Sequence, residues 1–295
     1  MIPKLEMLLA LAKERHFGHA AQSLGIAQPT LSAGIRQLEE QLGVRLVNRG
    51  SRFGGLTPEG QRTLLWARRI VGDSRQLRDE MRSSHTGLSG HLRIAVIPTA
   101  LTWTAQLTAR FGRAHPNVNF TVLSRSSAEI LELIENLDVD AGMSYLDNEP
   151  LGRMRAEPLY RENYCVVCGP RHALAQRDSL SWADLEGLTL CLLTPDMQNR
   201  RIVNRGFREA GIAPRVAVEA NSTIMLVGNV LYGGHATILP TDLAGFLVTG
   251  HDLVSIPVAE AGPAHSVGLI ALHQEPQTPV MQALMKSVSD LRSRF

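Results

Sequence analysis

FGHAAQSLGIAQPTLSAGIRQLEEQL, residues 17–42, has the pattern of two helices joined by a tight turn. The first helix has a small apolar inner face at Ala20, Ala21 and Leu24. Gly25 follows where the chain must turn, because a residue without a Cβ atom adopts positive φ at little cost. Pro29 lies in the first turn of the second helix, where a missing N–H costs no hydrogen bond. The stretch therefore predicts a short helix, a glycine turn and a second helix.

The second helix has one apolar and one polar face. Its apolar residues recur at spacings of 4, 3 and 4 and predict one buried stripe: Leu31, Ile35, Leu38 and Leu42. The polar residues left facing outward are Gln28, Thr30, Ser32, Arg36 and Gln37. This is the helix-turn-helix layout and indicates DNA binding. An ordinary pair of antiparallel helices is the alternative interpretation.

The flanking sequence supplies further parts of such a domain. Pro3 begins an earlier helix, whose predicted inner stripe is Leu5, Leu8, Leu9 and Ala12. Residues 44–56 contain β-favouring residues interrupted by glycines, and they predict a two-stranded wing. Arg45, Arg49 and Arg52 are spaced through this wing, where guanidinium groups can contact phosphates or the minor groove. A solvated basic loop is the alternative.

Composition excludes several classes of protein. The chain has 295 residues and a net charge of +2, and no apolar run approaches the length of a membrane span. The brief apolar LLALA near the N-terminus is followed at once by charges, so we expect no signal peptide. Three cysteines cannot all pair, which favours a reducing compartment. Residues 1–90 carry net +5 and residues 91–295 carry net −3, so the basic end coincides with the helix-turn-helix, although chance can produce so modest an excess.

A long helix is predicted from about 58 to 84. Thr57-Pro58-Glu59 has a capping hydroxyl, a proline at the first helical position and an acid near the positive helix end. A narrow apolar seam follows, which predicts pairing with a helix of a second subunit: Leu64, Ala67, Val71, Ser74, Leu77 or Arg78, and Met81. Residues 83–90 are polar and contain glycine, and they predict a domain boundary.

From His91 onward, strands and helices alternate, which predicts an open α/β sheet. Strands are expected at 92–97, 118–123 and 139–143, with helices at 100–113 and 127–136. A second such unit begins near Tyr164. Its expected strands are YCVVCGP, LTLCLL, VAVEA and HATILP. Its expected helices lie near 182–186, 199–210 and 222–231. Strands return over 253–272, and a final helix runs from about 278 to 293. Two α/β units between which the chain crosses twice are typical of a binding domain with a cleft.

Polar residues follow four of the predicted strands. Thr99 follows the first strand, Ser126 the second, Thr194 follows LTLCLL, and Asn221 follows VAVEA. Ligands of open α/β sheets bind beyond the carboxyl ends of strands, so convergence of these loops predicts a small anion site. Helix N-capping alone also explains each of these residues. Arg125 either contributes a charge-assisted contact to that site or forms a surface ion pair.

Motifs for catalysis or metal binding do not emerge. Cys165 and Cys168 lie in a predicted strand, where positions i and i+3 point to opposite faces, so we expect two buried apolar side chains. The histidines, among them His235 and His251 near strand ends, show no metal-site spacing, and no phosphate-binding loop or nucleophile elbow occurs. The sequence therefore predicts a protein that is not an enzyme and holds no metal or cofactor.

The whole chain resembles the LysR-type transcriptional regulators. The resemblance is most specific in FGHAAQSLGIAQPTLSAGIRQLEEQLGVRLVNRG and the following LTPEG, and it continues more weakly in LRIAVIPT, residues 136–140 and GGHATILP. Two positions depart from the family pattern. Ala27 replaces the usual serine, which removes an N-cap hydroxyl, and Ala33 replaces a residue that is often polar or arginine. Both departures bear on operator preference.

The resemblance implies a winged helix-turn-helix at 1–57, a linker helix for dimerisation at 58–86, and a two-lobed α/β effector domain of periplasmic-binding-protein type at 91–295. Lobe 1 would comprise about 91–161 and 266–295, and lobe 2 about 162–265. Carried over by position, the DNA-binding residues are Gln28, Pro29, Thr30, Ser32, Arg36, Arg49 and Arg52, and the effector-binding residues are Thr99, Ser126, Thr194 and Asn221.

The same resemblance implies partners and location. It predicts a cytoplasmic regulator that binds promoter DNA as a dimer or tetramer, contacts RNA polymerase if it is an activator, and has no membrane partner. The expected effector is a small carboxylate or other anion, with formate as one guess. A solute-binding protein with the same two lobes is the competing interpretation, but it would need an export signal and would not use residues 1–65.

Overall fold

The structure is a computed structural model that describes residues 1–48, 53–147, 151–259, 264–273 and 277–292. For residues 75–76, 79–80 and 82–86 it describes the backbone alone. The chain divides into two compact units, Met1–Thr86 and Gly87–Phe295, and each is described by itself. Among the described residues, no helix has an apolar stretch long enough to cross a membrane.

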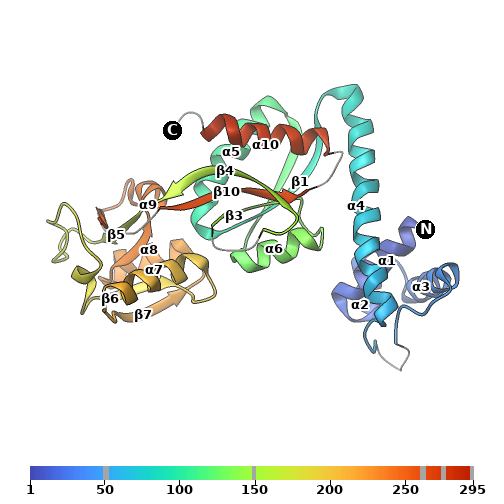
Figure 1. The fold of residues 1–295 in the computed structure, drawn as a ribbon, viewed down its shortest axis with the longest axis horizontal. Coiled ribbons are helices and arrows are strands. Elements are labelled where there is room, and N and C mark those ends of the chain that lie inside the picture. The colour runs from blue at the N-terminus through green and yellow to red at the C-terminus, as the bar shows by residue number, and fades with distance from the viewer. Residues whose placement is uncertain (49–52, 148–150, 260–263, 274–276, 293–295) are drawn as a thin grey trace. The chain divides into compact units, whose positions relative to one another are not determined.

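The first unit is helical (Figure 1). Its helices are α1 (Ile2–Glu14), α2 (Phe17–Ser23), α3 (Gln28–Leu42) and α4 (Pro58–Thr86). The predicted turn is confirmed, because Gly25 has φ +65° and the Ile26 N–H donates to Ala21 O at 3.0 Å. The predicted stripe on α3 is confirmed at three positions but wrong at Leu42, which is 39% exposed. Leu42 ends α3 immediately before the left-handed Gly43, beyond the reach of the core.

Helix α1 packs against α2, α3 and α4. Leu5, Leu8 and Leu11 are its buried residues, so the expected stripe at Leu9 and Ala12 is displaced. The helices α1 and α3 approach closely at Gly34, where a Cβ atom would collide with the sulfur of Met7. This contact fixes the position of α3 on the unit and leaves its polar face free.

The described part of the segment after α3 pairs with itself, as the predicted wing requires. Within the described residues it contains one antiparallel bridge, Val47 to Leu56, and no longer strand. The Asn48 N–H donates to Gly55 O at 3.0 Å. Arg49 and Arg52, predicted to contact DNA from this wing, lie outside the described residues.

The predicted start of α4 is confirmed, because the Thr57 hydroxyl accepts from the Gly60 N–H at 2.9 Å. The predicted seam is partly wrong. Ala67 and Val71 are buried in the core of their own unit, with Leu64 packed beside them, because α1 lies against that side of α4. An apolar stripe is exposed on α4, consisting of Trp66, Ile70, Leu77 and Met81, of which Leu77 and Met81 belong to the predicted seam. We call it the outer stripe.

The second unit has two lobes. Lobe 1 contains one five-stranded sheet of order β2-β1-β3-β10-β4, in which β1 is parallel to β2 and β3, and β10 is antiparallel to β3 and β4. Helices α5 and α10 cover one face and α6 the other (Figure 1). The bounds are β1 Ser89–Val96, η1 Pro98–Ala100, α5 Leu101–Ala114, β2 Asn117–Ser124, α6 Ser127–Glu135, β3 Ala141–Tyr145, β4 Met154–Glu162, β10 His265–Leu272 and α10 Pro279–Arg292.

Lobe 2 is built on two small sheets, β8-β5-β9 and β6-β7. A parallel bridge from Leu190 to Ala236 joins them. The bounds are β5 Tyr164–Cys168, η2 Ala183–Leu185, β6 Thr189–Leu193, α7 Gln198–Glu209, β7 Arg215–Ala220, α8 Thr223–Gly233, β8 Thr237–Pro240, α9 Thr241–Val248 and β9 Val254–Pro257. The chain passes between the lobes at Asn163 and again between β9 and β10. The predicted α/β alternation is confirmed, but the sequence interpretation omitted β4 and α9.

Candidate DNA-binding surface and effector site

The helix α3 presents its first turns to solvent. Gln28, Pro29, Thr30 and Arg36 are exposed, and Ser32 is half-buried. The residue before the helix, Ala27, has no side-chain hydrogen bond to the helix start, as its replacement of serine predicts. The exposed amide, hydroxyl and guanidinium groups form a surface of hydrogen-bond donors suited to a nucleic acid backbone.

A buried glutamate connects α3 to the wing. Glu39 is 8% exposed, and its Oε1 accepts from the Leu46 N–H at 2.8 Å and from the Val47 N–H at 3.2 Å. Gly60 of α4 lies against the backbone of Leu46, so closely that a Cβ atom would collide with the Leu46 carbonyl. The wing is therefore attached to α3 and α4. The sequence interpretation missed Glu39, because EE pairs on an exposed helix are ordinary.

In lobe 1, Thr99 and Ser126 follow neighbouring strands. Register pairs Val96 of β1 with Ser124 of β2, so the loops after them lie at the same sheet edge. Thr99 is 2% exposed, and its Oγ1 makes no hydrogen bond of regular geometry in the described chain, although it lies close enough to the Tyr145 hydroxyl and the Glu162 carboxyl to lower the pKa of both. Ser126 instead caps α6, because its Oγ accepts from the Glu129 N–H at 3.4 Å and donates to Glu129 Oε2 at 2.9 Å. The simpler N-cap interpretation accounts for Ser126. Arg125 is exposed, and its guanidinium donates to Ser124 O at 2.7 Å.

In lobe 2, Thr194 and Asn221 also follow neighbouring strands. Leu193 of β6 pairs with Ala220 of β7, and the Thr194 N–H donates to Ala220 O at 3.1 Å. The Thr194 Oγ1 is buried and has no partner in the described chain, whereas Asn221 is exposed.

Two further polar groups share these edges. The sequence interpretation placed Ser127 in the polar loop after the second strand but did not select it as an effector-binding residue, and it missed Asn199. Ser127 begins α6 and is fully buried, and Asn199 lies in the first turn of α7 and is 4% exposed. The Ser127 Oγ and the Asn199 Nδ2 have no partner in the described residues. No sequence signal marks Asn199, because an asparagine near a helix start is usually a cap.

These four atoms define what we call the unpaired set: Thr99 Oγ1, Ser127 Oγ, Thr194 Oγ1 and Asn199 Nδ2. Leaving a buried polar group without a hydrogen bond costs about 1–3 kcal/mol. Groups of this kind, in the loops and helix starts that follow parallel strands of both lobes, are typical of a ligand site.

The first turn of α7 is anchored by a buried arginine. Arg200 is 7% exposed, and its Nη1 donates to Leu193 O at 2.7 Å and to Glu219 Oε1 at 2.8 Å. Its Nε donates to Asn204 Oδ1 at 2.9 Å. These bonds fix the start of α7 against the ends of β6 and β7, so Asn199 beside it is held in place.

A buried carboxyl lies where the chain leaves lobe 1. Glu162 is 2% exposed and accepts hydrogen bonds from the hydroxyls of Tyr145 at 2.7 Å, Tyr160 at 3.1 Å and Tyr164 at 3.1 Å. Burial raises the pKa of Glu162, and the hydrogen bonds from the tyrosines and the proximity of Thr99 oppose that rise. Burial also raises the pKa of each tyrosine well above its ordinary value, with the charge of Glu162 adding to the effect. We call these four residues the Glu162 cluster.

Near the point where the chain returns from lobe 2 to lobe 1, the pKa of His265 is shifted by charged residues of both lobes. Burial lowers the pKa of His265 at the start of β10, Asp147 raises it, and Arg205 of α7 lowers it. Asp147 also accepts from the Ser266 N–H at 2.6 Å.

All three cysteines are buried and free. Cys165 packs in one apolar cluster of lobe 2 and Cys168 in another, which confirms that they face opposite sides of the sheet. Burial raises the pKa of Cys165 to about 12 and that of Cys191 to about 11. In the described part of the chain, no three His, Cys, Asp or Glu side chains come together as a metal site would require.

A helix-turn-helix with a wing, followed by a two-lobed α/β unit with unsatisfied polar groups at its strand ends, defines a DNA-binding protein with a small-molecule domain. Family models agree. Residues 2–61 match "Bacterial regulatory helix-turn-helix protein, lysR family", and residues 85–292 match "LysR substrate binding domain". The chain therefore belongs to the LysR family of transcriptional regulators, with a DNA-binding helix-turn-helix and an effector-binding domain.

The chain is also similar to individual proteins, at low sequence identity. The chain is similar to a hydrogen peroxide-inducible genes activator of Dickeya chrysanthemi, with 30% identity over 81% of this chain and 79% of that protein. Full-length OxyR from Pseudomonas aeruginosa has the same fold, with a TM-score of 0.74 and 22% identity over 98% of this chain and 94% of that one.

Two further solved structures share the fold. CbnR, a LysR family regulator complexed with its target DNA, gives a TM-score of 0.68 at 21% identity and covers 99% of both chains. The effector-binding domain of QuiR in complex with shikimate gives 0.59 at 20% identity, over 70% of this chain and 98% of that one.

Proposed function

We propose that this regulator binds promoter DNA as a dimer or larger assembly in the cytoplasm, under the control of a small anion bound between its lobes. The observation that carries the anion site is the unpaired set, whose atoms come from the strand ends of both lobes. The first-turn N–H groups of α6 and α7 accompany these atoms, and helix starts favour negative charge. The effector-binding domain of QuiR is a precedent in the same family, because it is in complex with shikimate, which carries a carboxylate.

DNA contact is assigned to the exposed start of α3 and to the wing. Gln28 offers a bidentate amide suited to adenine, and Arg36 a cation for guanine or phosphate. Pro29, Thr30 and Ser32 position the helix start, and Arg49 and Arg52 extend the contact from the wing. The complex of CbnR with its target DNA supports this assignment for a protein of the same fold. In a dimer the two α3 helices would enter successive major grooves about 34 Å apart.

Self-association is assigned to the outer stripe of α4. Trp66 is 62% exposed, Leu77 59% and Met81 54%, so the unit alone leaves much apolar surface in water. Exposed apolar residues that recur along one helix face are typical of a helix that pairs with another. If the assembly activates transcription, it also contacts RNA polymerase.

The effector acts as a switch only through a difference in affinity between two arrangements of the lobes. Closing the lobes on an anion satisfies the hydroxyls of Thr99 and Thr194 at once. Ser126 supports the site from the cap of α6, and Asn221 borders it from the end of β7. The resulting change in lobe arrangement then alters how the dimer holds its two DNA-binding domains.

The DNA assignment is tested by quantitative DNA binding. Gln28→Ala should relax base preference more than it lowers non-specific affinity, because an amide that reads a base edge discriminates by about 1–3 kcal/mol. Arg36→Gln should reduce the slope of log K against log salt by about 1 if it contacts a phosphate. Gln41→Ala, on the exposed last turn of α3, is the control. An unchanged base preference in Gln28→Ala would remove Gln28 from the interface.

The effector assignment is tested by thermal shift with formate, acetate, succinate and benzoate. An acid that stabilises the wild type should not stabilise Thr194→Val, which removes the unpaired hydroxyl but keeps its shape. Thr249→Val, whose hydroxyl already bonds to Gly245 O at 2.7 Å, should respond as the wild type does. Stabilisation by uncharged analogues alone would contradict an anion site.

A further inference from the structure

The carboxyl of the Glu162 cluster lies where the chain passes from lobe 1 to lobe 2. Glu162 is the last residue of β4, and Tyr164 is the first residue of β5. Glu162 Oε2 accepts from the Tyr145 hydroxyl at 2.7 Å and from the Tyr164 hydroxyl at 3.1 Å, so one carboxyl oxygen binds hydroxyls of both lobes. Tyr160 donates to the other oxygen, Oε1, at 3.1 Å. A change in the arrangement of the lobes therefore alters the surroundings of this carboxyl.

Hydroxyl groups, and not a cation, compensate this carboxyl. In the part of the chain that the structure describes, no arginine or lysine forms an ion pair with Glu162, and the groups that donate to it are tyrosine hydroxyls. Its side chain is buried, so its charge has also lost most of its contact with water. Burial favours the neutral form of such a carboxyl and hydroxyl donors favour the charged form. The loss of one donor therefore shifts the balance toward the neutral acid.

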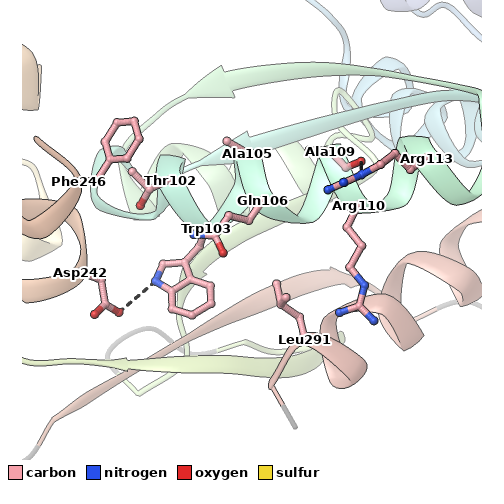
Figure 2. Close-up of a pocket in the computed structure, with 10 residues that line it drawn as sticks. All are labelled: Thr102, Trp103, Ala105, Gln106, Ala109, Arg110, Arg113, Asp242, Phe246 and Leu291. Carbon is pink, nitrogen blue, oxygen red and sulfur yellow. Dashed lines mark hydrogen bonds between the residues drawn. The ribbon is translucent and has the colours of Figure 1, made fainter. Parts of the chain in front are cut away.

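Two other titratable side chains approach the cluster from neighbouring elements. His265 of β10 is paired in register with the glutamate, and its ring meets the Tyr145 ring edge-on at a centroid distance of 6.3 Å. Asp242 of α9 accepts from Trp103 Nε1–H at 3.2 Å, and the indole stacks on Tyr160 at 4.8 Å (Figure 2). An imidazole can also take up a proton near neutral pH, so His265 must be separated from the glutamate by mutation.

The hydroxyl of Thr99 connects this cluster to the proposed effector site. It belongs to the unpaired set. Burial raises the pKa of both Glu162 and Tyr145, and the Thr99 hydroxyl lies close enough to lower each of them again. A hydroxyl has one hydrogen to donate, so it serves either the buried carboxylate or a bound anion. An anion that accepts this hydrogen withdraws a donor from Glu162 and adds a negative charge nearby, and both effects favour the neutral form of Glu162.

We propose that Glu162 takes up one proton when the anion binds at Thr99, so that the site binds a weak acid as its anion together with its proton. The new O–H of Glu162 donates to the Thr99 oxygen, and the Thr99 hydrogen is donated to the anion. The proton balance is that of binding the neutral acid. This inference rests on the effector site proposed above, and it adds that effector affinity falls as pH rises. The regulator then responds to an acid and to acidity together.

The test is isothermal titration of the full-length protein with formate, acetate and benzoate between about pH 6 and pH 7.5, in imidazole and in ACES buffer. These acids are ionised throughout the range, because carboxylic acids titrate near about pH 4. For an acid that binds, the difference in heat between the two buffers should show uptake of up to about one proton per anion. Its affinity should fall by up to about tenfold per pH unit as pH rises. Glu162→Gln should bind the acid without proton uptake, and the exposed Glu135→Gln should behave as the wild type does.

The possible outcomes separate this inference from the effector site itself. An acid that binds the wild type without proton uptake overturns the role of Glu162 and leaves the effector site in place. If none of the three acids binds at any pH, the anion site fails and the proton uptake fails with it. Uptake that persists in Glu162→Gln also overturns the proposal. Should Glu162→Gln not fold, His265→Gln decides, because uptake that disappears with the histidine contradicts the proposal and uptake that remains supports it.

Discussion

At the scale of single residues, Glu162 is a carboxyl whose burial is costly and whose neighbours offset that cost. Its carboxyl has left water but accepts three tyrosine hydroxyls, so the charged form is hydrogen-bonded although desolvated. The cluster lies where the chain passes from β4 in lobe 1 to β5 in lobe 2. Sequence reading could not find it, because Tyr145 joins it only through the pairing of β3 and β4 with β10.

Glu162 should make stability depend on pH. Its pKa is raised in the folded state, so its contribution is fully present below the ordinary glutamate pKa of about 4.3 and is lost as pH rises through the folded value. Each unit of the shift corresponds to about 1.4 kcal/mol. Urea unfolding should therefore show the wild type gaining stability relative to Glu162→Gln as pH falls from 8 to 5. The exposed Glu135→Gln is the control, and a difference that stays flat with pH would contradict the argument.

The cysteines should be unreactive in the native protein. The thiolate is the reactive form of cysteine. Burial raises the pKa of Cys165 to about 12 and that of Cys191 to about 11, so little thiolate forms. Ellman's reagent at pH 8 should label none of the three thiols until guanidinium chloride unfolds the chain. Peroxide treatment should leave DNA affinity unchanged. Rapid labelling of the folded protein would contradict this.

Residue roles in the candidate effector site were only partly predictable. The ends of the predicted strands indicated where polar groups would gather. Register pairs Val96 with Ser124 and Leu193 with Ala220, so the loops after these strands lie at two sheet edges. The sequence could not show which hydroxyl is already hydrogen-bonded within the protein and which is not. Ser126 bonds to Glu129, whereas Ser127 beside it is buried without a partner, and that distinction depends on the direction of α6 over the sheet.

At the scale of elements, α4 shows why periodicity alone misassigned a contact. Its apolar residues follow two interleaved stripes. Ala67 and Val71 face α1, and Trp66 and Ile70, one residue before each, belong to the outer stripe. A helix of 29 residues can satisfy one neighbour near its start and another along its length. The sequence interpretation merged both stripes into a single seam.

The outer stripe should control self-association. Trp66→Ala combined with Leu77→Ala removes the largest exposed apolar side chains on that face and should shift the assembly toward monomer in sedimentation velocity. Leu65→Ala is the matched control, because Leu65 is 63% exposed on the same helix but outside the stripe. If the double variant sediments as the wild type does, the assembly forms through another surface.

The attachment of the wing should depend on Glu39. Glu39→Ala leaves two buried N–H groups, those of Leu46 and Val47, without an acceptor, at a cost of about 1–3 kcal/mol for each. Glu39→Gln keeps a carbonyl oxygen and should lose less. We expect lower unfolding free energy and weaker DNA binding in Glu39→Ala than in Glu39→Gln, measured by urea unfolding and by titration of an operator fragment. Equal losses in both variants would show that the charge, not the acceptor, matters.

Among the elements, the strand β4 and the helix α9 could not be predicted from the hydrophobic pattern of the sequence. β4 reads MRAEPLYRE, with charges and a proline that are tolerated because it is the edge strand beside β10. α9 has eight residues and follows Pro240 directly, too short to show a helical period. The long elements with a clear period, such as α3 and α5, were predicted at nearly their full extent.

At the scale of the whole molecule, the apolar cores divide as the chain does. One core lies within residues 1–86, and the other clusters lie within the second unit, where the two lobes share one of them. Separate cores are expected to unfold separately, because cooperativity follows shared packing. The lobes, which share packing and the Trp103–Asp242 bond, should unfold together.

Calorimetry of the full chain should therefore show two transitions that respond to different ligands. A ligand that binds only the folded form of one unit stabilises that unit by RT ln(1 + [L]/Kd), about 2.7 kcal/mol at a hundredfold excess over Kd. An operator fragment should raise the transition of residues 1–86, and an effector acid that of residues 87–295. Thr194→Val should abolish only the second shift and Arg36→Gln should reduce only the first, so each variant is the control for the other. A single transition raised by both ligands would mean that the two units unfold as one, and that the coupling between DNA and effector is carried by shared packing.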